Sequence, residues 1–274
     1  MTQHPADDTT SLPNIRYHHR TLFLSDLHLG AHGCRADRLL DFLRQNSADR
    51  LYLVGDILDV WHPLRPRWSA LHDSIIDLIR ERMAQGMELV LLAGNHDAAL
   101  KETVSPFAGA VALDTAVHRT ARGRSFLVLH GDACDARILR HHLATRIGTR
   151  LDGSLRGIDA ALRRLRRNLP ADHRSLIERL LSAVNACLAW GAAHERRLIA
   201  LAQAQGHDGV ICGHFHKPAL HDRDGLTYVN CGDWVDSLTA IAEDVEGHLR
   251  LVSVPAFAPL PAPQEGLNEL EPVL

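Results

Sequence analysis

Short apolar runs recur along the chain, and each is followed at once by a polar or glycine-containing turn. Thr21–Leu24, Arg50–Val54 and Glu88–Leu92 have the length and composition of buried strands. Between them, apolar residues recur at helical spacing over Asp37–Gln45 and Ser69–Ala84. Strands that alternate with helices in this way predict a mostly parallel sheet with helical crossovers.

Three later runs predict more strands at Phe126–Leu129, Gly209–Cys212 and Leu226–Asn230, which we expect to form a second sheet. The pattern favours an α/β fold built as a four-layer α/β/β/α sandwich. Residues 136–205 are helical in pattern throughout, with a break at Asn168-Leu169-Pro170, and indicate a helical insertion packed on the sandwich.

These patterns divide the chain into three parts. We expect residues 1–20 to be a flexible N-terminus and residues 21–254 to form one domain that carries the insertion at about 136–205. Residues 255–274 contain five prolines and show no periodicity, which predicts an extended or disordered tail.

Composition excludes several classes of protein. With 274 residues and 46% hydrophobic side chains, the chain can bury a large core, but it has no apolar stretch of membrane-spanning length and no signal-peptide pattern. We therefore expect a cytoplasmic protein, or one peripheral to the inner membrane. Five scattered cysteines without CxxC spacing argue against a disulfide framework or a zinc ribbon. A formal net charge of -3 argues against general attraction to nucleic acid.

Side chains that bind metals follow five of the six apolar runs. They are Asp26 and His28 after the first run, Asp56 and Asp59 after the second, Asn95 and His96 after the third, His130 after the fourth, and His214 and His216 after the fifth. Because the carboxyl ends of parallel strands share one edge of a sheet, we expect these residues to meet at one site.

The chemistry of this set favours two metal ions. Carboxylate, amide and imidazole ligands without thiolate suit Mn²⁺, our first candidate, and also Fe²⁺ or Zn²⁺. The seven candidate ligands Asp26, His28, Asp56, Asn95, His130, His214 and His216 are too many for one ion. Two divalent ions would use them all and would serve an in-line displacement at phosphorus.

The motifs D-x-H, GD-x-x-D, GNH-D, H and GH-x-H occur here in that order, and in this the chain resembles the calcineurin-like metallophosphoesterase superfamily. The resemblance implies that the first ion lies on Asp26, His28 and His216, the second on Asn95, His130 and His214, with Asp56 bridging. It implies that His96 is a catalytic residue and not a ligand, donating to a phosphate oxygen or to the leaving group. Asp59 would orient the imidazole of His96 and raise its pKa.

Within the superfamily, the segments Gly213–Ala219 and Asn230–Trp234 and the insertion after His130 resemble the UDP-2,3-diacylglucosamine pyrophosphatase branch of lipid A synthesis. This resemblance implies cleavage of a UDP-linked pyrophosphate to UMP and a lipid sugar phosphate. The best-known members of this branch have the motifs GNRD and GD-x-x-E at the positions where this chain has His96 and Asp59. Two alternatives stay open: a phosphodiesterase or nuclease acting on another nucleotide or phospholipid, and a non-catalytic metal-bound scaffold, which we would expect to have lost ligands.

The predicted insertion is rich in arginine. The arginines before its break at Asn168 are Arg137, Arg140, Arg146, Arg150, Arg156, Arg163, Arg164, Arg166 and Arg167, and an apolar face follows over 176–201. We expect a lid that contacts a phosphorylated lipid at a membrane surface, or else an ordinary helical hairpin with a solvated basic face. The absence of an aromatic stacking platform argues further against nucleic acid as a partner. The pattern predicts no particular oligomeric state.

Several neighbouring residues have two interpretations. Asp97 and Asp132 either orient ligands and loop backbone or serve as caps. Arg65, Arg67 and Trp68 either contact the substrate or lie in a surface loop, which we favour. Phe215 lies between two candidate ligands, and we expect it to pack rather than bind.

Overall fold

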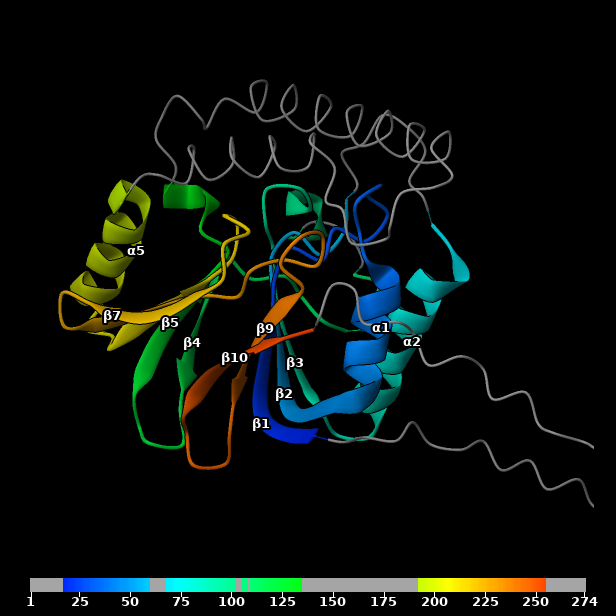
Figure 1. Ribbon diagram of the computed structural model, residues 1–274, viewed down its shortest axis with the longest axis horizontal. Helices are drawn as coiled ribbons and strands as arrows, with labels where there is room; N and C mark the ends of the chain where they lie inside the picture. The colour runs from blue at the N-terminus through cyan, green and yellow to red at the C-terminus, as the bar shows by residue number, and fades with distance from the viewer. Residues whose placement is uncertain (1–16, 60–67, 102–104, 108, 135–191, 255–274) are drawn as a thin grey trace, which may run out of the picture.

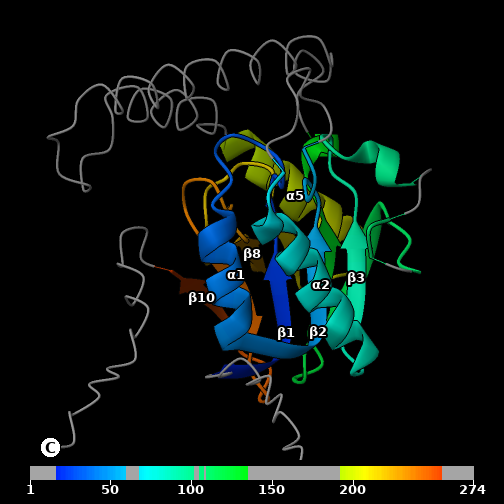
Figure 2. The same cartoon turned by 90° about the vertical axis from the view of Figure 1, so that its right-hand side faces the viewer.

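The computed structural model describes residues 17–59, 68–101, 105–107, 109–134 and 192–254. Two five-stranded sheets lie face to face (Figure 1). Helices α1 (Ala36–Gln45) and α2 (Ala70–Ala84) cover the outer face of one sheet, and α5 (Ala192–Ala204) covers the outer face of the other (Figure 2). No helix in the described ranges is long and apolar enough to cross a bilayer.

The first sheet has the strand order β10-β9-β1-β2-β3. Its strands are β1 (Tyr17–Leu24), β2 (Asn46–Val54), β3 (Glu88–Leu92), β9 (Thr239–Glu243) and β10 (Leu249–Ser253). The strands β1, β2 and β3 pair in parallel, as the alternation of strands and helices predicts. The late strands β9 and β10 are added as an antiparallel pair beside β1, so the sheet is mixed.

The second sheet has the order β4-β5-β6-β8-β7. Its strands are β4 (Thr115–Arg119), β5 (Ser125–Leu129), β6 (Gly209–Cys212), β7 (Ala219–Arg223) and β8 (Leu226–Asn230). The three central strands β5, β6 and β8 are parallel, and the edge strands β4 and β7 run antiparallel to them. The prediction that the late apolar runs form a second sheet is confirmed.

Alternating residues of each central strand fill different layers. Leu22 and Leu24 of β1 pack with the helices α1 and α2, whereas Phe23 packs between the two sheets, where its ring stacks on Tyr52 at 4.7 Å. On the other side, Leu198 of α5 belongs to a third apolar cluster with the outer face of β5, β6 and β8. These three cores separate four layers, so the predicted α/β/β/α sandwich is confirmed.

The first strand is longer than its apolar run. It begins at Tyr17, four residues before the predicted start at Thr21, so Tyr17–Arg20 belong to the strand and not to a flexible N-terminus. These residues are polar because they pair at the end of the sheet: His19 Nε2 lies 3.0 Å from Asn46 Oδ1, across the β1–β2 pair. Their polarity hid the strand from the hydrophobic pattern.

Four strands were missed because each lies at a sheet edge or beside one. The sequences of β4, β7 and β10 mix polar and apolar residues, and their burial is correspondingly uneven. The strand β9 is buried throughout but ends in the charged residue Glu243. Of the predicted insertion at 136–205, the described part confirms a helix at Ala192–Ala204. Residues 135–191, the N-terminal residues 1–16 and the tail 255–274 lie outside the described residues.

A buried carboxylate joins the two sheets at the end remote from the ligand-bearing loops. Glu243 has no exposed surface and accepts hydrogen bonds from Arg20 Nη1, Thr21 Oγ1 and the backbone N–H of Ala121. Its Oε2 also lies 2.9 Å from His118 Nε2 on β4. Burial would raise the pKa of Glu243, but these donors, led by His118, lower it to about 2.

We expect Glu243→Gln to lower the free energy of unfolding by about 2–4 kcal/mol at pH 7, because an anion with several donors is replaced by a neutral amide. The folded-state pKa lies below the ordinary value of 4.5. The stabilisation is therefore present above that value and is lost as the pH falls toward about 2. Urea unfolding of both proteins between pH 3 and pH 7, with a chelator present, measures the difference.

Glu246→Gln is the matched control, since the side chain of Glu246 is 74% exposed in the turn before β10. Its free energy of unfolding should stay within about 0.5 kcal/mol of the parent protein. A difference between Glu243→Gln and the parent that did not shrink below pH 4.5 would contradict the argument.

Candidate metal centre

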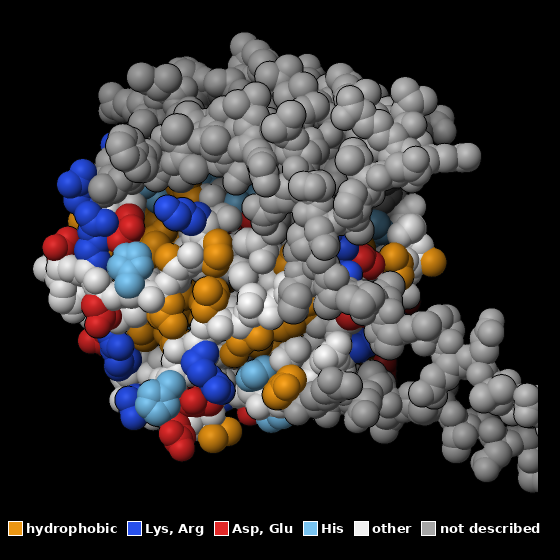
Figure 3. Space-filling model, viewed as in Figure 1, with side chains coloured by type: hydrophobic (Ala, Val, Ile, Leu, Met, Phe, Trp, Pro, Cys, Tyr) orange, Lys and Arg blue, Asp and Glu red, His pale blue; other side chains and the backbone are white. Residues whose placement is uncertain are grey.

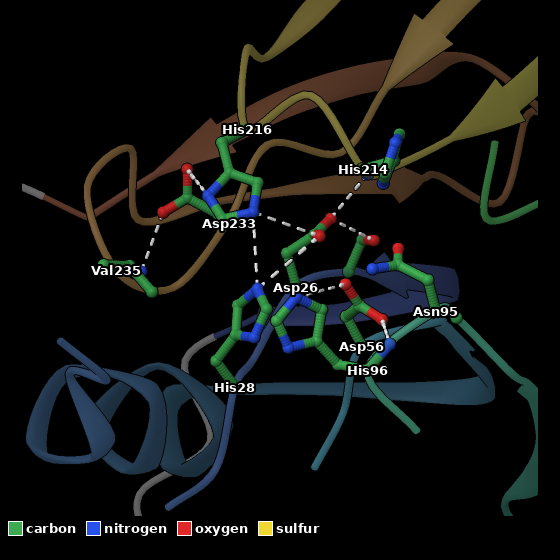
Figure 4. A network of polar contacts seen from close by, with 12 residues as sticks. Asp26, His28, Asp56, Asn95, His96, His214, His216, Asp233 and Val235 are labelled. Atoms are coloured by element: carbon green, nitrogen blue, oxygen red, sulfur yellow. Dashed lines mark hydrogen bonds and ion pairs between the residues drawn. The ribbon is translucent and has the colours of Figure 1, made fainter. Parts of the chain in front are cut away.

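The loops that follow β1, β2, β3, β5 and β6 meet at one edge of the sandwich, and they bring all seven candidate ligands together with His96 and Asp59. Figure 4 shows six of these ligands and His96. These strands are parallel within each sheet, so their carboxyl ends share that edge. Both sheets contribute loops, because the two sheets are stacked with these ends aligned.

A first group of ligand atoms belongs to Asp26, His28 and His216, which all lie within 4.8 Å of one another. The two Nε2 atoms of the imidazoles are 3.3 Å apart, and Asp26 Oδ1 lies 3.3 Å from that of His216 and 3.9 Å from that of His28. Asp26 Oδ1 is buried, yet it accepts no hydrogen bond from any described residue. A buried carboxylate oxygen facing two imidazole nitrogens fits a cation.

A second group is formed by Asp56, His130 and His214. His130 Nε2 lies 3.3 Å from Asp56 Oδ2 and 3.3 Å from Asn95 Oδ1, so the predicted amide ligand is at the same place. The Nδ1 atom of His130 donates to the carbonyl oxygen of Val54 at 3.0 Å. This bond turns Nε2 toward the other ligand atoms.

Two contacts make these groups one site. Asp56 lies within 4.8 Å of His28 and His96 in a third group, so its carboxylate is shared between the two sets of ligands. The other oxygen of Asp26, Oδ2, accepts a hydrogen bond of 2.8 Å from the backbone N–H of His214. The two sets thus lie side by side, and a hydrogen bond joins them.

His96 and Asp59 form a buried pair beside the shared carboxylate. His96 Nδ1 lies 3.5 Å from Asp59 Oδ1, and His96 Nε2 lies 4.0 Å from Asp56 Oδ2. The backbone N–H of His96 donates to Asp56 Oδ1 at 2.8 Å, which holds the residue against the site. Burial would lower the pKa of His96, but Asp59 and then Asp56 raise it above its ordinary value.

The carboxylates and imidazoles of the site shift one another's pKa values. Burial would raise the pKa of Asp56, but His130 holds it well below 3.8, and the pKa of His130 is raised in return. Burial would likewise lower the pKa of His216, but Asp233 and the other carboxylates raise it to about 10. His28 differs, because its burial lowers the pKa to about 4. Cation binding at these ligands would therefore release protons.

Glycines permit the loops to approach one another. A Cβ atom at Gly94 would overlap Asp56 Oδ1, and one at Gly213 would overlap Ser25 Oγ and crowd Asp26 Oδ2. Neither position has room for another residue without displacing a candidate ligand.

The backbone at the candidate ligands is unusual. Five of them have left-handed conformations, with φ values of 53° at Asp26, 47° at His28, 52° at Asp56, 72° at His214 and 54° at His216. Within the described ranges, Asp224 and Leu238 are the other non-glycine residues with positive φ. Such conformations cost on the order of 1–3 kcal/mol each and persist where the surroundings impose them. They turn the chain sharply at the strand ends.

Asp97 holds two of these loops together. Its Oδ1 accepts the backbone N–H of Gly94 at 2.7 Å, and its Oδ2 accepts the N–H groups of Ile57 and Leu58 at 2.7 and 3.2 Å. The interpretation that Asp97 orients loop backbone is confirmed. Asp132 begins the short 3-10 helix η2 (Asp132–Cys134), next to His130.

Two residues, one at the end of β8 and one in the loop after it, were missed as site residues. Asn230 donates from Nδ2 to the carbonyl oxygen of Gly213 at 2.8 Å, which fixes the loop before His214. Asp233 Oδ2 lies 3.5 Å from His216 Nδ1. Leu226–Asn230 was the one apolar run without an assigned ligand after it, and its parallel pairing with β6 was the signal that its end reaches the same edge.

The remaining candidates lie at the surface, pack beside the site or fall outside the described residues. Trp68 is 44% exposed and donates from Nε1 to Asp73 Oδ1 at 2.7 Å, as expected for a surface residue. Phe215 packs on His194 with ring centroids 4.0 Å apart, so the prediction that it packs is confirmed. Arg65 and Arg67 lie outside the described residues.

Comparison with known proteins identifies a family that the chain matches. A protein-family model described as calcineurin-like phosphoesterase matches residues 19–218. UDP-2,3-diacylglucosamine hydrolase of Marinobacter nauticus is 26% identical over 233 residues, 80% of this chain and 91% of the relative. The protein of that name from Haemophilus influenzae is 28% identical over 229 residues, 80% of this chain and 92% of the relative. A solved structure of a phosphoesterase from E. coli is 14% identical with a TM-score of 0.42, covering 86% of this chain and 99% of that one.

Proposed function

The chain belongs to the calcineurin-like phosphoesterase family, and we propose that it hydrolyses the pyrophosphate bond of a nucleotide-linked lipid such as UDP-2,3-diacylglucosamine, using two divalent cations. Family membership makes it a hydrolase of phosphoric ester or anhydride bonds. The observation that carries the proposal is the shared carboxylate of Asp56, which lies in two neighbouring ligand groups with His96 beside it.

We assign the ligands to the two cations as the family resemblance implies. The first cation is assigned to Asp26, His28 and His216, and the second to Asn95, His130 and His214, with Asp56 contributing to both. Mn²⁺ is the first choice of metal, with Fe²⁺ and Zn²⁺ as the alternatives that suit the same donors. Two such cations polarise phosphoryl oxygens and lower the pKa of water, which is the chemistry that the side chains alone lack.

His96 supplies a proton at the site. Its imidazole is buried beside Asp56, and Asp59 faces its Nδ1 atom, so Nε2 is the nitrogen directed at the reacting groups. A proton on Nε2 can be donated to a phosphate oxygen or to the leaving oxygen. Asp59 orients the ring and keeps it protonated to higher pH.

The substrate class rests on the relatives. Both of the relatives described above are named UDP-2,3-diacylglucosamine hydrolase, and each aligns with 80% of this chain. The products would be UMP and the lipid sugar phosphate. A diacylated substrate resides in a membrane, so the enzyme would act from the cytoplasmic face as a peripheral protein. The arginines of 136–167 that we expect to contact it lie outside the described residues.

His96 also favours a second candidate, a phosphodiesterase acting on another nucleotide or phospholipid. Pyrophosphate cleavage expels a phosphate, which leaves without a proton, whereas diester cleavage expels an alkoxide, which requires one. A buried histidine whose pKa is raised by neighbouring carboxylates suits the second reaction especially well. A nuclease is disfavoured, because basic and acidic side chains are interspersed on the described part of the face in Figure 3 and form no basic track. The complete ligand set argues against a scaffold.

We expect Mn²⁺-dependent release of UMP from UDP-2,3-diacylglucosamine, and a fall of about 10²–10³-fold in kcat/KM in Asn95→Ala, which loses a ligand. The assay compares this substrate with bis-p-nitrophenyl phosphate, and Gln85→Ala, which truncates an exposed amide at the C-cap of α2, is the matched control. Activity on the diester alone would assign the second candidate. No activity on either substrate with both ions bound would contradict both.

A further inference from the structure

A carboxylate that the sequence motifs left without a role is fixed beside the first ligand group. Asp233 has no exposed surface. Its Oδ1 accepts the backbone N–H groups of Val235, Asp236 and Ser237 in the turn that follows it. The hydroxyl of Ser237 accepts the backbone N–H of Asp233 at 2.8 Å. The loop thus holds the carboxylate in one orientation.

The second oxygen of this carboxylate points at a candidate ligand. Asp233 Oδ2 is buried and lies 3.5 Å from His216 Nδ1 (Figure 4), and it accepts no hydrogen bond from elsewhere in the described chain. The same loop is tied to the first ligand group, since the backbone N–H of Trp234 donates to the carbonyl oxygen of Asp26 at 3.1 Å. The loop therefore places the carboxylate relative to the site.

The imidazole of His216 lies between two carboxylates. Its Nδ1 atom faces Asp233, and its Nε2 atom lies 3.3 Å from both Asp26 Oδ1 and His28 Nε2. A neutral imidazole carries one proton, and the nitrogen without it is the one that binds a metal. A proton held on Nδ1 leaves Nε2 as the ligand.

In the second ligand group, the imidazole of His130 is oriented in the same way, but by a weaker acceptor. The Nδ1 atom of His130 donates to the carbonyl oxygen of Val54, and Nε2 faces Asp56 and Asn95. A carboxylate in place of the carbonyl also makes the ligating nitrogen more basic. His216 therefore has the stronger orienting partner of the two.

We propose that Asp233 is a positioning residue: its Oδ2 accepts the Nδ1–H of His216, and so directs Nε2 of His216 at the first cation. The inference rests on the proposed role of His216 as a ligand. Its consequence is that Asp233 sets the affinity of one of the two cation sites without touching the cation.

The test is Asp233→Asn in the full chain, titrated with Mn²⁺ from the metal-free state by calorimetry. Asparagine keeps an oxygen for the three backbone donors but places an NH₂ group against His216. This NH₂ group cannot accept a hydrogen bond from the Nδ1–H of His216. We expect one of two Mn²⁺ sites to weaken by about 10–100-fold and the other to stay unchanged. Electron paramagnetic resonance at two equivalents of Mn²⁺ should show fewer spin-coupled pairs, restored by excess Mn²⁺.

Two further variants, Ser237→Ala and His216→Ala, distinguish a positioning role of Asp233 from a role in the loop alone and from a wrong ligand assignment of His216. Ser237→Ala loosens the turn but keeps the carboxylate that faces His216, so it should weaken Mn²⁺ binding much less than Asp233→Asn does. Equal weakening in Ser237→Ala and Asp233→Asn would reduce Asp233 to a loop residue and overturn the inference. If His216→Ala loses one ion while Asp233→Asn keeps both, the inference alone fails. If His216→Ala keeps both ions, the ligand assignment of the proposed function fails.

A measurement on the parent protein does not depend on the folding of any variant. In ¹⁵N-histidine-labelled protein loaded with diamagnetic Zn²⁺, the ring of His216 should carry its proton on Nδ1, as seen in long-range ¹H–¹⁵N spectra. A proton on Nε2 would overturn the inference.

Discussion

Asp56→Asn should abolish hydrolysis, with a fall of about 10³-fold or more in kcat/KM, because one carboxylate serves both cation groups. Asparagine preserves the acceptor for the backbone N–H of His96 and the shape of the side chain, so the loops should keep their positions. The charge that lies 3.3 Å from His130 is lost. We therefore expect the stoichiometry of Mn²⁺ binding to fall from two ions per chain to one or fewer.

Mn²⁺ stoichiometry from equilibrium dialysis and the rate with the preferred substrate are measured on the same preparation. Asp49→Asn is the matched control, since Asp49 lies on β2 as well but its side chain is 69% exposed and pairs with His18. It should bind two ions and keep its rate within about twofold. An Asp56→Asn protein that retained two ions and parental activity would refute the proposal that the Asp56 carboxylate serves both cations.

His96→Gln should lower the rate by an amount that depends on the leaving group. If His96 protonates the leaving oxygen, the loss should be about 10²–10⁴-fold for an alkyl phosphodiester and less than about tenfold for a p-nitrophenyl ester, whose leaving group needs no proton. If His96 instead donates to a phosphate oxygen, both esters should lose about the same factor. The ratio of the two losses decides between the roles that the family resemblance leaves open.

Asp59→Asn tests the partner of this histidine. Asp59 raises the pKa of His96, so removing its charge should lower that pKa and move the alkaline limb of the pH–rate profile to lower pH. A profile that did not move would exclude the orienting role. His248→Gln, on the exposed turn between β9 and β10, is the control histidine and should leave both the rate and the profile unchanged.

Much of this arrangement could be predicted from the sequence. Gly209–Cys212 and Leu226–Asn230 were predicted with their observed boundaries, because both strands lie inside the second sheet and are buried along their whole length. The convergence of Asp26, Asn95 and His214 followed from their common position after parallel strands. An unbroken apolar run and the direction of its strand are enough to predict these features, because both are local properties of the chain.

Other features depend on contacts that no local pattern records. Strand β10 exists because Leu249–Ser253 pair with β9, and the polar residues of β10 face solvent at a sheet edge. Asp233 follows a run with no ligand of its own, and its importance lies in a contact with His216 from another loop. The same holds for Glu243, whose donors come from β1 and from the segment after β4.

The left-handed conformations at five candidate ligands bear on protein engineering. Transferring Asp26, His28, Asp56, His214 and His216 to the loops of an unrelated sheet would reproduce the ligand chemistry but not the backbone that aims it. A designed host would relax those positions to ordinary right-handed or extended geometry and lose the convergence of the side chains. A successful graft would have to include the residues that hold the loops in place, among them Asp97 and Asn230.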